Sequence, residues 1–230
     1  MIFLYVRHGE PIYNPDSLTP HGEEQARALA KRMAVLGVDR VFSSSSNRAI
    51  QTAKPTCELL NKEMEILDFA NEAYAFRDFS IEIEGGRTWP FQSKDMELTF
   101  ADSEIVSMGH DWHNHPDMTR FKKGLDRVYN DVYNLFKSLG YEHIKGTSKY
   151  KVIKPNNDRV AFFAHQGFGV AFLSAVLNIP YPIVSNHFEL VHTGVTVINF
   201  EELGEYAIPK MMSLSSDGHL YKEGLPTGYF

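Results

Sequence analysis

Apolar and polar positions follow two different periods along the first seventy residues. Met1 to Val6 is an unbroken apolar run of the kind found in buried strands, and Val38 to Phe42 and Glu63 to Phe69 predict two more strands. Between them, apolar residues recur every three or four positions over Pro20 to Leu36 and Arg48 to Leu60, which predicts helices. Strands alternating with helices are typical of a parallel sheet.

The same reading continues in the second half of the chain. Apolar residues at helical spacing from Phe121 to Leu139 predict a helix that ends at Gly140. Val160 to Phe163 predicts a core strand, and Val191 to Phe200 and Tyr206 to Leu214 predict two more. Lys149 to Lys154, flanked by turn residues, is expected to form an excursion such as a hairpin. We therefore predict an α/β fold with a mostly parallel central sheet and helices on both faces.

Composition narrows the classes of function. The chain has 230 residues, of which 43% are apolar, enough for a sizeable core. The net charge is −6 with only 23 Lys and Arg, which argues against a nucleic-acid partner, so an anionic ligand would need a local pocket. The single cysteine, Cys57, excludes a disulfide framework and favours a reducing compartment.

The apolar runs are too short for a membrane segment. The first run is not preceded by a basic region and is followed at once by charged residues, unlike a signal peptide. No stretch approaches the roughly eighteen apolar residues of a membrane span. We expect a cytoplasmic protein with no membrane partner.

Chemistry-bearing residues follow three predicted strands. The tetrad Arg7-His8-Gly9-Glu10 follows the first strand, Ser43 to Ser46 the second, and His165 the strand that ends at Ala164. Because ligands of open α/β sheets bind outside the carboxyl ends of the strands, we expect these groups to meet in one crevice. Arginines and histidines there favour an anionic ligand, and Glu10, which would repel one, is interpreted as structural.

These motifs, in this order, resemble the histidine phosphatase superfamily, also called phosphoglycerate-mutase-like. The resemblance is close over about the first seventy residues and looser from Val160 onward, whereas positions 77 to 158 match little. The matching positions are Arg7, His8, Gly9, Glu10 and Asn14, then Leu18, Thr19, Gly22, Gln25 and Ala26, then Ser43, Ser44, Arg48, Ala49, Gln51, Thr52 and Ala53, and finally His165.

The resemblance implies a three-layer sandwich, a phosphohistidine chemistry and a role for each matching residue. His8 would be the nucleophile, and Arg7 and Arg48 would grip the phosphate oxygens, since a guanidinium matches phosphate in a bidentate way. A protonated His165 would add positive charge, helped by the amides of the helix that follows it. Asn14 and Gln166 would complete the binding of the substrate.

The proton donor is the least regular part of the match. Glu72 occupies the family's position after the third strand, but without the usual neighbouring Leu and Gly, so Glu82 and Glu84 remain alternatives. A donor needs a raised pKa beside the leaving group, which burial against aromatic residues would supply. No metal or other cofactor is implied.

The middle of the chain offers a competing interpretation. His110, His113 and His115 lie within six residues and are conceivable metal ligands, although no Cys pair or His-Glu-x-x-His helix supports them. We expect a single domain over 1–230 with an insertion at about 73–120 that covers the active site and contains this cluster. Five aromatic residues there would shape specificity or pack the insertion's own core: Phe76, Phe79, Trp89, Phe91 and Trp112.

The leading hypothesis is a metal-independent phosphatase that acts on a small phosphorylated metabolite through a phosphohistidine on His8. A phosphoglycerate mutase is the first alternative, although Glu72 is not followed by the mutases' Arg-His-Tyr-Gly. A noncatalytic protein that binds a phosphorylated ligand is the second. The sequence identifies neither the substrate nor the oligomeric state.

Overall fold

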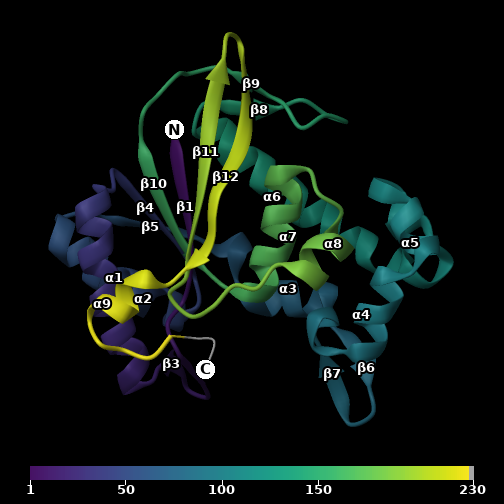
Figure 1. The fold of residues 1–230 in the computed structure, drawn as a ribbon, viewed down its shortest axis with the longest axis horizontal. Helices are drawn as coiled ribbons and strands as arrows, with labels where there is room; N and C mark the ends of the chain where they lie inside the picture. The colour runs from purple at the N-terminus through teal and green to yellow at the C-terminus, as the bar shows by residue number, and fades with distance from the viewer. Residues whose placement is uncertain (228–230) are drawn as a thin grey trace.

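The computed structural model describes residues 1–227, and within them the central sheet has eight strands (Figure 1). Their order is β5-β4-β10-β1-β11-β12-β9-β8. The first four are parallel: β5 (Met64–Leu67), β4 (Arg40–Ser44), β10 (Arg159–Ala164) and β1 (Ile2–Arg7). The other four pair antiparallel: β11 (Val195–Leu203), β12 (Tyr206–Ser216), β9 (Tyr150–Val152) and β8 (Tyr141–His143). The predicted α/β fold class is confirmed, with a mixed sheet that is parallel over β5-β4-β10-β1 and antiparallel from β1 to β8.

Helices cover both faces of this sheet (Figure 1). On one face lie α1 (Pro20–Leu36), α2 (Asn47–Leu60) and α9 (Gly218–Lys222). On the other lie α3 (Glu72–Phe79), α6 (Lys122–Ser138) and α7 (Gln166–Leu177). Because successive strand residues point to opposite faces, Leu4 and Val6 of β1 join the core under α1, whereas Phe3 and Tyr5 join the core under α6 and α7.

The register of the parallel strands brings three loops together. In β10, Ala164 pairs with Arg7 of β1, and Phe163 pairs with both Val6 and Ser43 of β4. The residues that follow these strands, among them His8 and His165, therefore emerge side by side at the carboxyl edge of the sheet. This is the edge at which the sequence predicted a common crevice.

Local signals account for the element ends. The Thr19 hydroxyl accepts a hydrogen bond from Gly22 N at 2.9 Å and caps α1, and Gly37 ends that helix at φ 72°. The excursion predicted at 149–154 is the β8–β9 hairpin, which closes one edge of the sheet.

The other helices and strands are short. Within residues 1–227 no helix is long and apolar enough to cross a membrane. The remaining elements are β2 (Pro11–Tyr13), β3 (Asp16–Leu18), η1 (Asp68–Ala70), β6 (Ile81–Ile83), β7 (Gly86–Thr88), η2 (Pro90–Gln92), α4 (Lys94–Ala101), α5 (Ser103–Ser107), η3 (Gly109–Asn114), η4 (Pro116–Phe121) and α8 (Tyr181–His187).

Candidate active site

His8 sits on a loop whose backbone is held by side chains of α1 and α2. Gly9 N donates to the Thr52 hydroxyl at 2.9 Å, and Glu10 N donates to Oε1 of Gln25 at 2.9 Å. The imidazole Nδ1 of His8 lies 2.7 Å from the carbonyl oxygen of Gly9. That carbonyl is an acceptor, so Nδ1 carries the proton and Nε2 keeps its lone pair.

Two glycines let this loop pack on the start of α1. A Cβ on Gly9 would lie 2.7 Å from the carbonyl oxygen of Gly22, and one on Gly22 would lie 2.3 Å from that of Glu10. Both obstacles are backbone, which cannot swing away. The Glu10 carboxylate accepts a hydrogen bond from the Thr19 hydroxyl at 3.0 Å and does not line the pocket, in keeping with a structural role.

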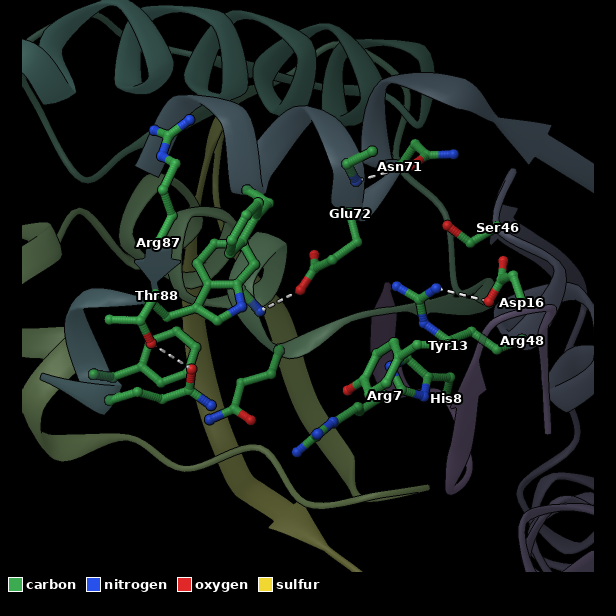
Figure 2. Close-up of a pocket in the computed structure, with 17 residues that line it drawn as sticks. Arg7, His8, Tyr13, Asp16, Ser46, Arg48, Asn71, Glu72, Arg87 and Thr88 are labelled. Carbon is green, nitrogen blue, oxygen red and sulfur yellow. Dashed lines mark hydrogen bonds and ion pairs between the residues drawn. The ribbon is translucent and has the colours of Figure 1, made fainter. Parts of the chain in front are cut away.

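Arg7, His8 and Arg48 line one cavity of about 620 Å³ (Figure 2). Arg7 donates to the carbonyl oxygen of Leu190 and lies 3.9 Å from the Glu189 carboxylate. Arg48 Nη1 donates to the Asp16 carboxylate at 2.7 Å, and its guanidinium lies 5.6 Å from the centre of the Tyr13 ring. The buried Nε atoms of both arginines have no hydrogen-bond partner among the described residues.

His165 lies directly beside His8, with 5.1 Å between the ring centres, but it is fully buried and does not line the cavity. Its Nε2 is 2.8 Å from the Ser44 hydroxyl, and its Nδ1 has no partner among the described residues. Burial, together with His8 and the two arginines, lowers the pKa of His165 well below its ordinary value. These effects favour the neutral ring near pH 7, and the protonated His165 expected beside a phosphate stays a prediction.

The pKa of His8 is shifted in the same direction. Burial and the charges of Arg7 and Arg48 hold it well below the ordinary histidine value, although the hydrogen bond to Gly9 opposes them. His8 is thus neutral near pH 7, which is the form that has a lone pair to attack phosphorus.

Glu72 reaches across from α3 to the N-terminus of α7. Its two carboxylate oxygens accept hydrogen bonds from Gly167 N and Phe168 N, each at 3.0 Å. These are the amides that the sequence reading assigned to an anionic ligand, so that expectation is corrected: a protein carboxylate occupies them. Burial raises the pKa of Glu72 to about 6, against the opposing effects of the two amides, Arg48 and Arg7.

The far end of the cavity is aromatic. The Phe76 and Trp89 rings meet edge to face with 5.2 Å between centres, and Trp89 stacks on Phe91 at 5.6 Å. Trp89 also lies against Gly167, where a Cβ would come within 2.2 Å of the indole ring. The cavity is lined by Arg7, His8, Tyr13, Asp16, Ser46, Arg48, Asn71, Glu72, Ala73, Phe76, Arg87, Thr88, Trp89, Phe91, Gln92, Gln166 and Gly167.

Other predicted site residues lie elsewhere or have protein partners. Asn14 is exposed on the β2–β3 turn and does not line the cavity. Gln166 lines it and donates to the Glu189 carboxylate at 2.8 Å. Glu82 and Glu84 are exposed in the β6–β7 hairpin outside the lining, which leaves Glu72 as the carboxyl nearest the arginines on the side of α3.

The histidine-rich segment does not lie over this cavity, contrary to the sequence-based expectation. His110 and His113 line a separate hollow of about 360 Å³, and Trp112 is buried against Phe100 and Tyr181. Only the part of the 73–120 segment up to Gln92 lines the candidate site, whereas the buried residues of 93–120, among them Phe100 and Trp112, join the hydrophobic core under α6 and α7. Within residues 1–227, no three His, Cys, Asp or Glu side chains gather in a group that could hold a metal ion.

Asp16, His192 and Arg87 are among the residues at the site that were not predicted. Asp16 binds Arg48, and its position between Asn14 and the Leu18-Thr19 pair was the only signal for it. His192 lies 5.7 Å from His8 between ring centres, and burial lowers its pKa to about 3. Arg87 comes from the hairpin before Trp89, where the sequence has no recognisable motif.

The family comparison agrees with this geometry. Residues 3–78 match the model of the histidine phosphatase superfamily, branch 1. The resemblance to the histidine phosphatase superfamily is confirmed. The match contains the histidine phosphatase motif of β1 and both arginines, and it ends within α3. No curated protein matches the sequence significantly.

Solved structures of histidine phosphatase type share the fold over nearly the whole chain. A phosphoserine phosphatase from Entamoeba histolytica superposes with a TM-score of 0.62 at 18% identity, covering 95% of this chain and 98% of the other. An alpha-ribazole phosphatase from Shigella flexneri gives 0.59 at 19% identity, covering 94% and 97%. A mycobacterial glucosyl-3-phosphoglycerate phosphatase gives 0.54 at 13% identity, covering 95% and 98%. At these identities the likeness establishes the fold.

Proposed function

We propose that the protein is a phosphatase that hydrolyses a small phosphate monoester through a phosphohistidine on Nε2 of His8. The observation that carries the proposal is the tautomer of His8: Nδ1 is held by the Gly9 carbonyl at 2.7 Å, and the ring lies in a cavity lined by Arg7 and Arg48. A nucleophile, two cations and an acid of raised pKa are the groups that phosphoryl transfer from an ester requires.

In the first step, Nε2 of His8 attacks phosphorus while the bond from phosphorus to the ester oxygen breaks. The leaving alkoxide takes its proton from the Glu72 carboxyl, whose pKa of about 6 leaves a useful fraction protonated near neutral pH. Arg7 and Arg48 neutralise the charge on the nonbridging oxygens. In the second step, the Glu72 carboxylate takes a proton from water, the water oxygen attacks phosphorus, and the bond to Nε2 breaks.

Substrate binding itself changes the charge of the second histidine. His165 is neutral beside two arginines, but a phosphate dianion would reverse the local potential and raise its pKa. The protonated His165 ring then adds a positive charge behind His8 that helps to hold the phosphate. The Ser44 hydroxyl, 2.8 Å from Nε2, keeps the ring turned toward this position.

The decisive test is turnover of p-nitrophenyl phosphate by wild type and the His8→Ala variant. We expect the variant to lose about 10³-fold or more of the rate, because no covalent intermediate can form. His110→Ala, an exposed histidine outside the cavity, is the matched control and should keep full activity. Equal rates for wild type and His8→Ala would refute the proposal and favour a noncatalytic role.

Two additions to that assay separate the competing activities. Incubation with 3-phosphoglycerate and a 2,3-bisphosphoglycerate primer should give little isomerisation, and rapid isomerisation would make the protein a mutase. A chelator should leave the phosphatase rate unchanged, whereas a loss that zinc restores would revive the metal hypothesis for the histidine-rich segment.

A further inference from the structure

The aromatic end of the cavity lies where the alcohol part of a phosphate ester would have to go. This argument rests on the proposed function. Glu72, the group that meets the leaving oxygen, is anchored on Gly167 N, and Gly167 is in contact with the Trp89 ring. Beyond the leaving oxygen the substrate would therefore extend along the part of the cavity lined by Phe76, Trp89 and Phe91, here named the aromatic wall.

The aromatic wall is fixed in place and partly open to the cavity. Its three side chains are each half-buried, and Trp89 and Phe91 are stacked almost parallel, with 11° between their planes. Trp89 cannot shift toward α7, because it already lies against Gly167, which has no side chain. A rigid aromatic surface facing a cavity favours a flat apolar partner, because stacking adds to the burial of apolar area.

Charges in this half of the cavity disfavour a second anionic group on the substrate. The Glu72 carboxyl lines this half of the cavity and in its charged form would repel such a group. Arg87 is the cation at this end of the lining, and its Nη2 donates to the carbonyl oxygens of Arg77 and Ser80. In Figure 2 the Arg87 guanidinium points away from Arg7 and His8. A short alcohol that carries a carboxylate, as phosphoglycerate does, would find no cation beside its phosphate other than those that hold the phosphate itself.

Two carboxamides beside the aromatic wall supply polar groups without charge. Gln92 accepts from the Thr88 hydroxyl at 3.0 Å through Oε1, and Gln166 donates to Glu189 through Nε2 at 2.8 Å. The Nε2 amino group of Gln92 and the Oε1 oxygen of Gln166 are not used in these two hydrogen bonds, so each can bind a ligand. Neutral hydrogen-bonding groups around an aromatic surface suit the edge of a ring.

We propose that this site selects phosphate monoesters whose alcohol carries a planar ring, and that Trp89 and Phe91 are its specificity-determining residues. The contrast is with short anionic alcohols such as glycerate. The ring would pack on the indole face while the ester oxygen stays within reach of Glu72.

The test compares benzyl phosphate with propyl phosphate, since both are esters of primary alcohols and differ chiefly in the ring. Wild type should have a kcat/KM about tenfold higher for benzyl phosphate. Trp89→Leu should bring the ratio of kcat/KM for the two esters close to one, whereas Trp89→Phe, the matched control, should retain part of the preference. Equal kcat/KM for the two esters in wild type, or a higher value for 3-phosphoglycerate than for benzyl phosphate, would overturn the inference.

A binding measurement separates this inference from the proposed function. The chain has two tryptophans, so Trp112→Phe leaves Trp89 as the only one. Titration with benzylphosphonate should change the fluorescence of this variant and should saturate at lower concentration than propylphosphonate. If neither ester is hydrolysed but benzylphosphonate binds in this way, the phosphatase proposal fails and the ring selectivity stands. If the esters are hydrolysed but the two phosphonates bind alike, the ring selectivity fails alone.

Discussion

At the scale of single residues, the unusual group is a carboxyl held by a helix N-terminus. Glu72 accepts two amide hydrogen bonds, yet burial keeps its pKa at about 6. As a general acid it acts only when protonated, so kcat/KM for alkyl phosphates, which reports the free enzyme, should fall about tenfold per pH unit above about 6. Glu72→Gln should lower kcat by about 10²-fold or more and abolish this fall, whereas Glu82→Gln, exposed in the β6–β7 hairpin, should do neither. A wild-type profile that stays flat to pH 8 would exclude Glu72 as the acid.

Asp16 binds Arg48, the guanidinium that the proposed mechanism assigns to the phosphate. Its carboxylate lies 2.7 Å from Arg48 Nη1 and also accepts from Asn47 N at 2.7 Å. Asp16→Asn keeps an acceptor for Asn47 N but removes the negative charge that competes with phosphate for the guanidinium. Inorganic phosphate should then inhibit about fivefold more strongly, a modest change because the pair is partly exposed. Glu10→Gln, a neutralised carboxylate outside the cavity, is the control. Weaker inhibition by phosphate in Asp16→Asn would mean that the charge of Asp16 orients Arg48 instead.

At the scale of elements, the site depends on how closely the His8 loop approaches α1. The two backbones meet through Gly9 and Gly22, and a Cβ at Gly22 would lie 2.3 Å from the Glu10 carbonyl oxygen. Gly22→Ala should therefore lower the free energy of unfolding by about 2 kcal/mol or more, since backbone must shift to make room. Gly218→Ala, where the added Cβ meets nothing within 4 Å, is the matched control. Urea denaturation measures both, and equal stability of the two variants would contradict this account of the loop.

At the scale of the whole molecule, several buried histidines couple stability to pH. Burial lowers the pKa of His8 and His165 well below the ordinary value, that of His192 to about 3 and that of His219 to about 4. Below pH 6.5 the unfolded chain binds these protons and the folded chain does not. Each such histidine therefore lowers the free energy of unfolding by up to about 1.4 kcal/mol per pH unit as the pH falls. Glu72 has the opposite effect between about pH 6 and pH 4.5, because its raised pKa lets the folded chain bind a proton there that the unfolded chain does not. In that range it offsets the effect of about one histidine.

Urea denaturation at pH 7 and pH 5 measures this coupling. The folded protein should be several kcal/mol less stable at pH 5, and His219→Gln should reduce the difference because one of the shifted groups is gone. His110→Gln, at an exposed position, should leave the difference unchanged. Equal stability of the wild type at the two pH values would contradict the burial of neutral histidines.

The main strands and helices, and the meeting of the histidine and arginine motifs at one edge of the sheet, could be predicted from the chain. The run from Met1 to Val6 became β1, and the helix predicted over Pro20 to Leu36 is α1, which Thr19 caps and Gly37 ends. Gln25 and Thr52 were matched as family signatures. In the structure their side chains accept hydrogen bonds from the backbone of the His8 loop and hold it in place. Such features depend on spacing within a few residues or on strand ends that a parallel sheet must place together.

The sequence by itself determined the strands and helices, the fold class and the order of the histidine and arginine motifs, since period and capping are local properties of the chain. Only the tertiary structure decided what the α7 amides bind, which aromatic residues face the cavity, and that the histidine-rich segment lies elsewhere. Glu72 and Gly167 are 95 residues apart in the chain. No local pattern encodes a contact over that distance, because it is set by the packing of α3 against α7 across one face of the sheet.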